Sequence, residues 1–139
     1  MHSLPLRVYY EDTDVGGVVY YANYLKYLER GRTEFLRDAG FNQSALANEI
    51  SRQFVVRSVQ LDLIAPARLD DTLTVETGVA DYRRASMVFD QQVMRHTKGQ
   101  PAQLLCAASI RVACVNTETL RPVAMPEDIK QALEKAKKP

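Results

Sequence analysis

The chain has 139 residues, the length of one domain, and we expect a single domain over residues 1–139. Lysine plus arginine number 18 and aspartate plus glutamate 17, so the net charge of +1 gives no global attraction to nucleic acid or to an anionic membrane. Two histidines and two cysteines are too few and too badly spaced for a zinc site, and they indicate no disulfide framework, which favours a cytoplasmic protein.

The N-terminal part of the chain predicts a strand, a loop and a long helix. Residues 4–11 read as a strand, and residues 12–17 as a loop rich in turn-forming residues. Residues 19–39 predict a helix of about five turns, because apolar side chains recur there at helical spacing, and Gly40 ends it. Residues 44–49 favour a further helical turn. The predicted apolar face of the long helix consists of Leu25, Leu28, Phe35, Leu36 and Ala39, with Gly31 beside it for close backbone approach.

The C-terminal part predicts four strands and a final helix. Alternating apolar and polar residues indicate strands at 53–64, 71–82, 85–96 and 103–115. Residues 126–138 predict a helix, with acidic residues at its start and lysines at its end. We therefore expect an α+β chain whose antiparallel strands are joined by short turns. One long helix leaves a sheet edge and a sheet face uncovered, so we also expect a homo-oligomer.

The loop before the long helix is the most informative stretch for chemistry. Asp14 precedes Gly16 and Gly17, and glycines let a ligand approach the backbone closely. The first helical turn, near residues 19–21, offers unpaired N–H groups that would polarise a carbonyl oxygen. A carboxylate beside that oxygen would attack the carbonyl carbon or activate water, as acyl transfer requires. The alternative is that Asp12 and Asp14 are turn or capping residues and that the glycines serve the turn alone.

Three segments of the chain resemble one enzyme family. They are YEDTDVGGVVYYANY at 10–24, FVVR at 54–57 and APARLDD at 65–71. Together they resemble the 4-hydroxybenzoyl-CoA thioesterase-like branch of the hotdog-fold acyl-CoA thioesterases, and within it the members associated with the bacterial Tol–Pal envelope system. The resemblance covers nearly the whole chain in the expected order.

This resemblance implies a fold, a reaction and a set of residues. The fold is a five-stranded antiparallel sheet wrapped around one long central helix, with a C-terminal helix in addition. The reaction is hydrolysis of the thioester of an acyl-CoA with a short aliphatic or aromatic acyl group. Asp14 is the implied nucleophile or general base, and the backbone N–H of Tyr21 polarises the carbonyl. Many Tol–Pal-type members have histidine in place of Tyr21, so a histidine-assisted mechanism is not expected. The implied substrate-binding residues of this loop and helix are Gly16, Gly17, Val18 and Tyr24.

A second basic segment resembles the strand that grips the nucleotide phosphates of CoA. Arg83 and Arg84 are suited to forked contacts with phosphate, and Ser86 follows them. Adjacent strand residues point to opposite faces, so both arginines reach one ligand only at a bulge or a strand end. The alternative is a pair of solvated arginines at a sheet edge.

Other residues and partners complete the sequence-based hypotheses. Glu29 and Glu34 are alternative catalytic acids, by analogy with a second hotdog branch. A non-catalytic module that binds acyl thioesters or acyl carrier protein is the alternative function. The resemblance implies a homodimer or homotetramer, with acyl-CoA and also acyl carrier protein as candidate substrates, and no metal or cofactor. The chain has no signal segment and no apolar run of about 18 residues, so no membrane insertion is expected. The tyrosines at 9, 10, 20, 24 and 27 are predicted to line the core and the acyl pocket, and both cysteines to be buried thiols.

Overall fold

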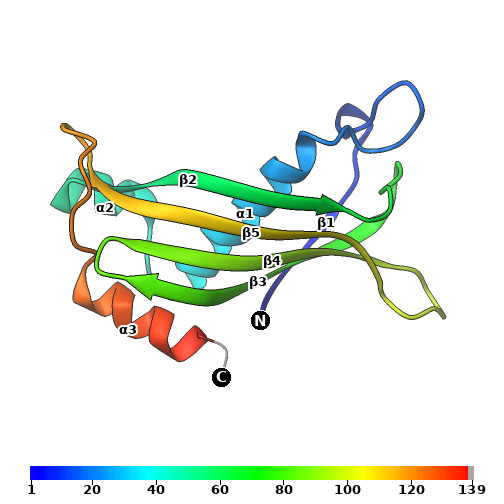
Figure 1. Ribbon diagram of the computed structural model, residues 1–139. Helices are drawn as coiled ribbons and strands as arrows, with labels where there is room; N and C mark the ends of the chain where they lie inside the picture. The colour runs from blue at the N-terminus through cyan, green and yellow to red at the C-terminus, as the bar shows by residue number, and fades with distance from the viewer. Residues whose placement is uncertain (138–139) are drawn as a thin grey trace.

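The computed structural model describes residues 1–137 as a five-stranded antiparallel sheet with three α-helices (Figure 1). The strand order is β1-β3-β4-β5-β2, so β1 and β2 form the two edges. The α+β class and the antiparallel sheet are therefore confirmed. The elements, in chain order, are β1 (His2–Arg7), a 3₁₀ turn (Tyr10–Asp12), α1 (Asn23–Asp38), α2 (Gln43–Ile50), β2 (Arg52–Leu63), β3 (Thr72–Arg83), β4 (Ser86–His96), β5 (Gln103–Asn116) and α3 (Glu127–Ala136).

Helix α1 packs across one face of the sheet against β1, β3 and β4 (Figure 1). Its buried residues are Tyr24, Tyr27, Leu28, Gly31, Phe35 and Leu36. The predicted apolar face is therefore wrong by part of a turn, because Leu25 is 42% exposed and Ala39 is exposed, whereas two tyrosines are buried. The tyrosine rings bring more apolar area to the sheet than Leu25 would.

Helix α1 approaches the sheet closely at Gly31, as predicted. A Cβ atom on Gly31 would lie 2.6 Å from Val75 Cγ1 and 2.9 Å from Thr77 Oγ1. The neighbouring buried side chain, Gln91, donates to Leu28 O at 2.9 Å and to Thr77 Oγ1 at 2.9 Å. The buried Gln91 amide thus forms hydrogen bonds with both the helix and the neighbouring strand, and these bonds fix the position of the helix on the sheet.

The boundaries of several elements differ from those predicted. Helix α1 begins at Asn23 rather than near residue 19, because the backbone at 18–19 pairs with Ala67 and Arg68 instead. The first strand ends at Arg7 rather than at residue 11. The helical turn predicted at 44–49 is helix α2, and Asn42 caps its N-terminus, because the Asn42 side chain accepts a hydrogen bond from the N–H of Ala45. The prediction for the last helix extends to residue 138, which lies outside the described residues.

Strand β2 is a long and exposed edge. It pairs with β5 on one side only, with an irregularity between Val56 and Ser58. Val56, Val59 and Leu63 are 47%, 44% and 52% exposed. An edge of this length with apolar side chains is a template for pairing with another strand. Within residues 1–137, no helix is long and apolar enough to cross a membrane.

Candidate active site

Asp14 lies at the tip of a tight hairpin that precedes α1. Its N–H donates to Val18 O at 2.9 Å, and its own carbonyl accepts from the N–H of Gly17 at 3.1 Å. Gly17 has a φ of +78°, which closes this three-residue loop and which an L side chain would strain. The Asp14 Oδ1 atom accepts from the N–H of Gly16 at 2.8 Å. One carboxylate oxygen is thus held by the turn, and the side chain remains exposed to solvent.

The start of α1 leaves two backbone donors open. The N–H of Val19 donates to Ala67 O at 2.8 Å, and that of Tyr20 donates to Asp12 O at 3.0 Å. The N–H groups of Tyr21 and Ala22 have no acceptor within residues 1–137. Ala22 is the N-cap and offers no side-chain acceptor. The predicted open donors are therefore at Tyr21 and Ala22 rather than at residues 19–20, at the positive end of the helix dipole.

A polar contact ties the hairpin to the helix start. The carbonyl of Asp12 accepts from the N–H of Tyr20 and also from Asn23 Nδ2 at 2.8 Å. Asp12 Oδ2 accepts from the N–H of Tyr9 at 2.8 Å. Asp12 therefore has the turn-stabilising role that was the alternative reading of the loop, and the contact of Asp14 Oδ1 with the N–H of Gly16 is of the same kind. Sequence reasoning missed Asn23, whose only signal is an amide side chain in the first turn after the loop.

An apolar pocket of about 250 Å³ adjoins the open donors. Leu63 and Ile64, at the end of β2, are 52% and 56% exposed at its rim. Tyr24 is buried and its hydroxyl accepts from the N–H of Ala67 at 3.0 Å, while burial raises its pKa. Sequence reasoning missed the contribution of β2, although Leu63–Ile64 interrupts the alternating pattern of that strand. The pocket is lined by Val19, Tyr21, Tyr24, Leu63, Ile64, Ala65 and Pro66.

The second basic segment lies at the opposite end of the sheet (Figure 1). Arg83 ends β3, Arg84 is in the turn and Ser86 begins β4, so the strand end that both arginines need is present. Both arginines are exposed and Ser86 is half-buried. The length of β3, about 36 Å, separates this turn from the strand start near the Asp14 hairpin. Within one chain, the two groups of predicted residues are not brought together.

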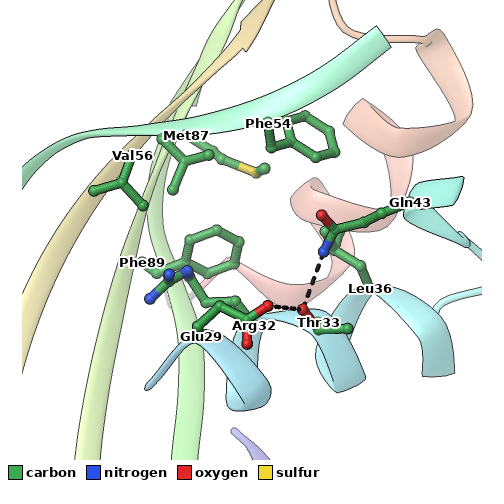
Figure 2. Close-up of a pocket in the computed structure, with 10 residues that line it drawn as sticks. Glu29, Arg32, Thr33, Leu36, Gln43, Phe54, Val56, Met87 and Phe89 are labelled. Atoms are coloured by element: carbon green, nitrogen blue, oxygen red, sulfur yellow. Dashed lines mark hydrogen bonds between the residues drawn. The ribbon is translucent and has the colours of Figure 1, made fainter. Parts of the chain in front are cut away.

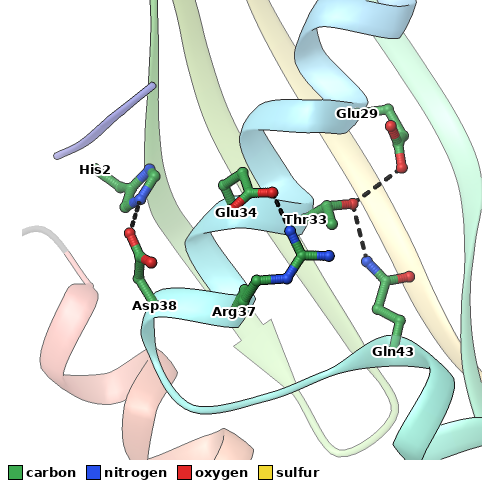
Figure 3. Close-up of polar contacts among 7 residues, drawn as sticks. All are labelled: His2, Glu29, Thr33, Glu34, Arg37, Asp38 and Gln43. Carbon is green, nitrogen blue, oxygen red and sulfur yellow. Dashed lines mark hydrogen bonds and ion pairs between the residues drawn. The ribbon is translucent and has the colours of Figure 1, made fainter. Parts of the chain in front are cut away.

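The alternative acids lie farther along α1. Glu29 accepts from the Thr33 hydroxyl at 2.9 Å and lines a pocket between α1 and β2 (Figure 2). Glu34 forms an ion pair with Arg37 on the same helix (Figure 3). Glu29 lies about 9 Å beyond Asn23 along the helix axis. Neither carboxylate is part of the hairpin that carries Asp14.

The remaining titratable residues divide between core and surface. Tyr24 and Tyr27 are buried, but the tyrosines at 9, 10 and 20 are exposed, so their predicted place in the core is wrong. Cys106 and Cys114 are free and buried, as predicted, and burial raises the pKa of Cys106 to about 11. In the described part of the chain, no group of three or more metal-ligating side chains is present.

Comparison with known proteins identifies the family. The family model described as "Thioesterase-like superfamily" matches residues 8–133. The chain belongs to this thioesterase family. The thioesterase is 45% identical over 135 residues to acyl-CoA thioesterase YbgC of Haemophilus influenzae, covering 97% of this chain and 96% of the relative.

Solved structures agree with the hotdog fold of this enzyme. A probable thioesterase from Bartonella henselae is 38% identical with a TM-score of 0.81, and the match covers 90% of this chain and 98% of that one. The 4-hydroxybenzoyl-CoA thioesterase of Pseudomonas sp. strain CBS-3 is 26% identical with a TM-score of 0.86, and the match covers 94% of this chain and 96% of that one. The chain is thus an enzyme of the thioesterase class and of the YbgC type.

Proposed function

We propose that this single-domain thioesterase hydrolyses acyl-CoA with a short aliphatic or aromatic acyl group. The observation that carries the proposal is the open N–H of Tyr21 at the start of α1, beside the hairpin that presents Asp14. An aligned backbone donor at a helix N-terminus favours negative charge on a carbonyl oxygen. In the hotdog arrangement, α1 is the central helix.

The proposed chemistry uses one carboxylate and backbone donors. As a general base, Asp14 takes a proton from water while the water oxygen bonds to the thioester carbon. As a nucleophile, Asp14 itself bonds to that carbon, and water then hydrolyses the resulting anhydride. In both routes the N–H of Tyr21 stabilises the oxyanion, the C–S bond breaks and the CoA thiolate takes up a proton. Gly16 and Gly17 leave room for the thioester because they carry no side chain, and Val18, which pairs with Asp14, follows them at the proposed substrate site.

The pocket beside Tyr21 suits the acyl group. Its walls combine the Tyr21 and Tyr24 rings with the exposed side chains of Leu63 and Ile64. Its volume of about 250 Å³ is slightly below the range of about 300–1,000 Å³ for pockets that hold drug-sized ligands, so it suits a small acyl group. These residues support a short or aromatic acyl group rather than a long chain.

The phosphate contacts require another copy of the chain. Arg83 and Arg84 lie too far from their own Asp14 to hold the same acyl-CoA, so we propose that they, with Ser86, serve the site of a neighbouring subunit. The exposed edge of β2 supports assembly into a homodimer or homotetramer. The buried free thiols support the expected cytoplasmic location. Acyl carrier protein as the thioester carrier, and a role beside the Tol–Pal system, are implied by resemblance.

The test is hydrolysis of a panel of thioesters by wild type and Asp14→Asn. The panel contains butyryl-, palmitoyl-, benzoyl- and 4-hydroxybenzoyl-CoA, and free thiol is detected. Asp14→Asn keeps the shape and removes the charge, so kcat is expected to fall at least about 100-fold. Glu34→Gln is the matched control, because Glu34 pairs with Arg37 on the helix surface, and its rate should stay near wild type. Unchanged kcat in Asp14→Asn would refute the assignment of Asp14.

A further inference from the structure

Arg95, near the end of β4, binds two points of the segment that connects β2 to β3, residues 64–71, which we call the β2–β3 loop. Its Nη1 donates to Pro66 O at 3.1 Å and to Asp71 Oδ2 at 3.0 Å, and its Nη2 donates to Gln103 Oε1 on the neighbouring strand β5. The loop lies at the same end of the sheet as the segment that precedes α1 (Figure 1). Arg95 thus anchors the loop to the sheet beside the candidate site.

The ion pair of Arg95 with Asp71 is partly shielded from water. Each of the two side chains is 21% exposed, so solvent and salt screen this pair less than one on the open surface. Asp71 Oδ2 also accepts from the N–H of Arg68 at 2.8 Å, and the Asp71 carbonyl accepts from the N–H of Val8 at 3.0 Å. Because the backbone around it fixes this carboxylate, Asp71 presents one geometry to the guanidinium.

The middle of the β2–β3 loop holds the start of α1. The carbonyl of Ala67 accepts from the N–H of Val19 at 2.8 Å, and the N–H of Ala67 donates to the Tyr24 hydroxyl at 3.0 Å. Ala67 is fully buried. The two contacts lie on either side of Tyr21 in the chain, so the position of the open Tyr21 N–H depends on where Ala67 is held.

One peptide group joins the Arg95 contact to the helix contact. The carbonyl of Pro66 and the N–H of Ala67 belong to the same planar peptide unit. Arg95 therefore binds one side of this unit, and the Tyr24 hydroxyl of α1 binds the other. Pro66 also lines the pocket beside Tyr21. A shift of this peptide would move both the pocket wall and the start of the helix.

We propose that Arg95 is a positioning residue of the thioester site, which places the Tyr21 N–H and the pocket wall relative to Asp14 by holding the Pro66–Ala67 peptide. The inference rests on the proposed function, since it takes the Tyr21 N–H as the donor to the oxyanion. It adds a residue that belongs neither to the Asp14 hairpin nor to the pocket lining. An ion pair that supported folding alone would change the amount of folded protein and leave kcat per folded molecule unchanged.

Steady-state hydrolysis of butyryl-CoA by Arg95→Gln tests the proposal, with kcat expressed per folded protein as measured by circular dichroism. We expect kcat and kcat/KM to fall together, at least about tenfold, because a misplaced oxyanion donor loses its effect in the transition state. KM should stay within about twofold of wild type for the same reason. Arg95→Lys keeps a charge for Asp71 and should recover part of the loss. Unchanged kcat, or a loss confined to KM, would overturn the proposal.

Asp71→Asn tests the same link from the side of the loop. Asparagine keeps the shape of the side chain and an oxygen for the N–H of Arg68, but it removes the charge that holds Arg95. We expect kcat to fall at least about threefold, since hydrogen bonds between charged groups are the stronger ones. The double variant with Arg95→Gln should be no slower than Arg95→Gln alone, because both substitutions act through one contact.

This second variant keeps the proposal testable even when Arg95→Gln does not fold. Unchanged kcat in Asp71→Asn would contradict the role of the ion pair. Losses that multiply in the double variant would show that the two residues act separately, which also contradicts it.

Two controls separate this inference from the proposed function. Arg37→Gln breaks an ion pair with Glu34 on the surface of α1, and kcat should stay within about twofold of wild type. Asp14→Asn tests the reaction itself. If Asp14→Asn loses hydrolysis and Arg95→Gln retains it, the inference fails and the proposed function holds. If Asp14→Asn is fully active, the proposed function fails, and the role of Arg95 in it fails too.

Discussion

Replacing Gly31 by alanine tests how closely α1 approaches the sheet. The added Cβ would lie 2.6 Å from Val75 Cγ1, 2.9 Å from Thr77 Oγ1 and 3.0 Å from Gln91 Nε2. All three neighbours are buried, so the methyl group has no open space to enter. The contact distances are well below those of ordinary van der Waals packing, and either the helix or the strand must move.

The expected magnitude follows from three opposing terms. Overpacking of a core costs about 1–3 kcal/mol, and disturbing the Gln91–Thr77 hydrogen bond costs about 1 kcal/mol. Alanine gains about 1 kcal/mol over glycine in helix propensity. The free energy of unfolding of Gly31→Ala should therefore be lower by about 1–3 kcal/mol, measured by urea denaturation at fixed protein concentration.

A double-mutant cycle with Val75→Ala provides the control. Val75→Ala removes the Cγ1 atom of the shortest contact, so the second substitution should cost less in that background, with a coupling of at least about 0.5 kcal/mol. If Gly31→Ala is as stable as wild type or more stable, the close approach of helix and sheet is wrong. Strict additivity of the two substitutions would show that Val75 is not the clashing neighbour.

Three further predictions concern the site and the core. Tyr24→Phe leaves the buried N–H of Ala67 without its acceptor, so the free energy of unfolding, measured by urea denaturation, should fall by about 1–3 kcal/mol. An unchanged urea midpoint would contradict this hydrogen bond. Burial raises the pKa of the Cys106 thiol from 9.0 to about 11, so the thiol ionises at lower pH in the unfolded state than in the folded state. The free energy of unfolding should therefore fall between about pH 9 and pH 11, and it should fall less steeply in Cys106→Ala. Equal pH slopes of the unfolding free energy in the two proteins would refute the assignment. The double variant with alanine at Arg83 and Arg84 should raise KM for butyryl-CoA about tenfold and leave KM for a butyryl thioester without the nucleotide unchanged; a rise for both substrates would exclude a phosphate contact.

Local signals in the sequence predicted much of the fold. The strands follow from a period of two, and the predicted ends of β3 and β4 are within one residue of those observed. The loop around Asp14 was predicted from its turn-forming residues, but its hairpin pairing and the left-handed backbone of Gly17 came from the structure. The start of α1 was not, since it depends on backbone pairing of residues 18–19 with a segment almost fifty residues later.

The candidate sites show where local reasoning ends. The pocket beside Tyr21 takes its outer wall from Leu63 and Ile64, and no local pattern places those residues next to the helix start. Arg32 Nη1 on α1 donates to Gln91 Oε1 on β4 although the two residues are 59 positions apart, and neither has a neighbour in sequence that signals this contact. Such pairs are set by the packing of a helix on a sheet, which periodicity describes only by face and not by register.

The doubly used carbonyl of Asp12 makes the hairpin and the first turn of α1 a single cooperative unit. The Asp12 carbonyl accepts from the N–H of Tyr20 on the hairpin side and from Asn23 Nδ2 on the helix side, so opening either segment breaks a hydrogen bond to the same oxygen. Amide hydrogens of the two segments should therefore exchange with solvent at similar free energies of opening. Asn23→Ala should lower both protections together, and an increase in exchange limited to the helix turn would show that the two segments move independently.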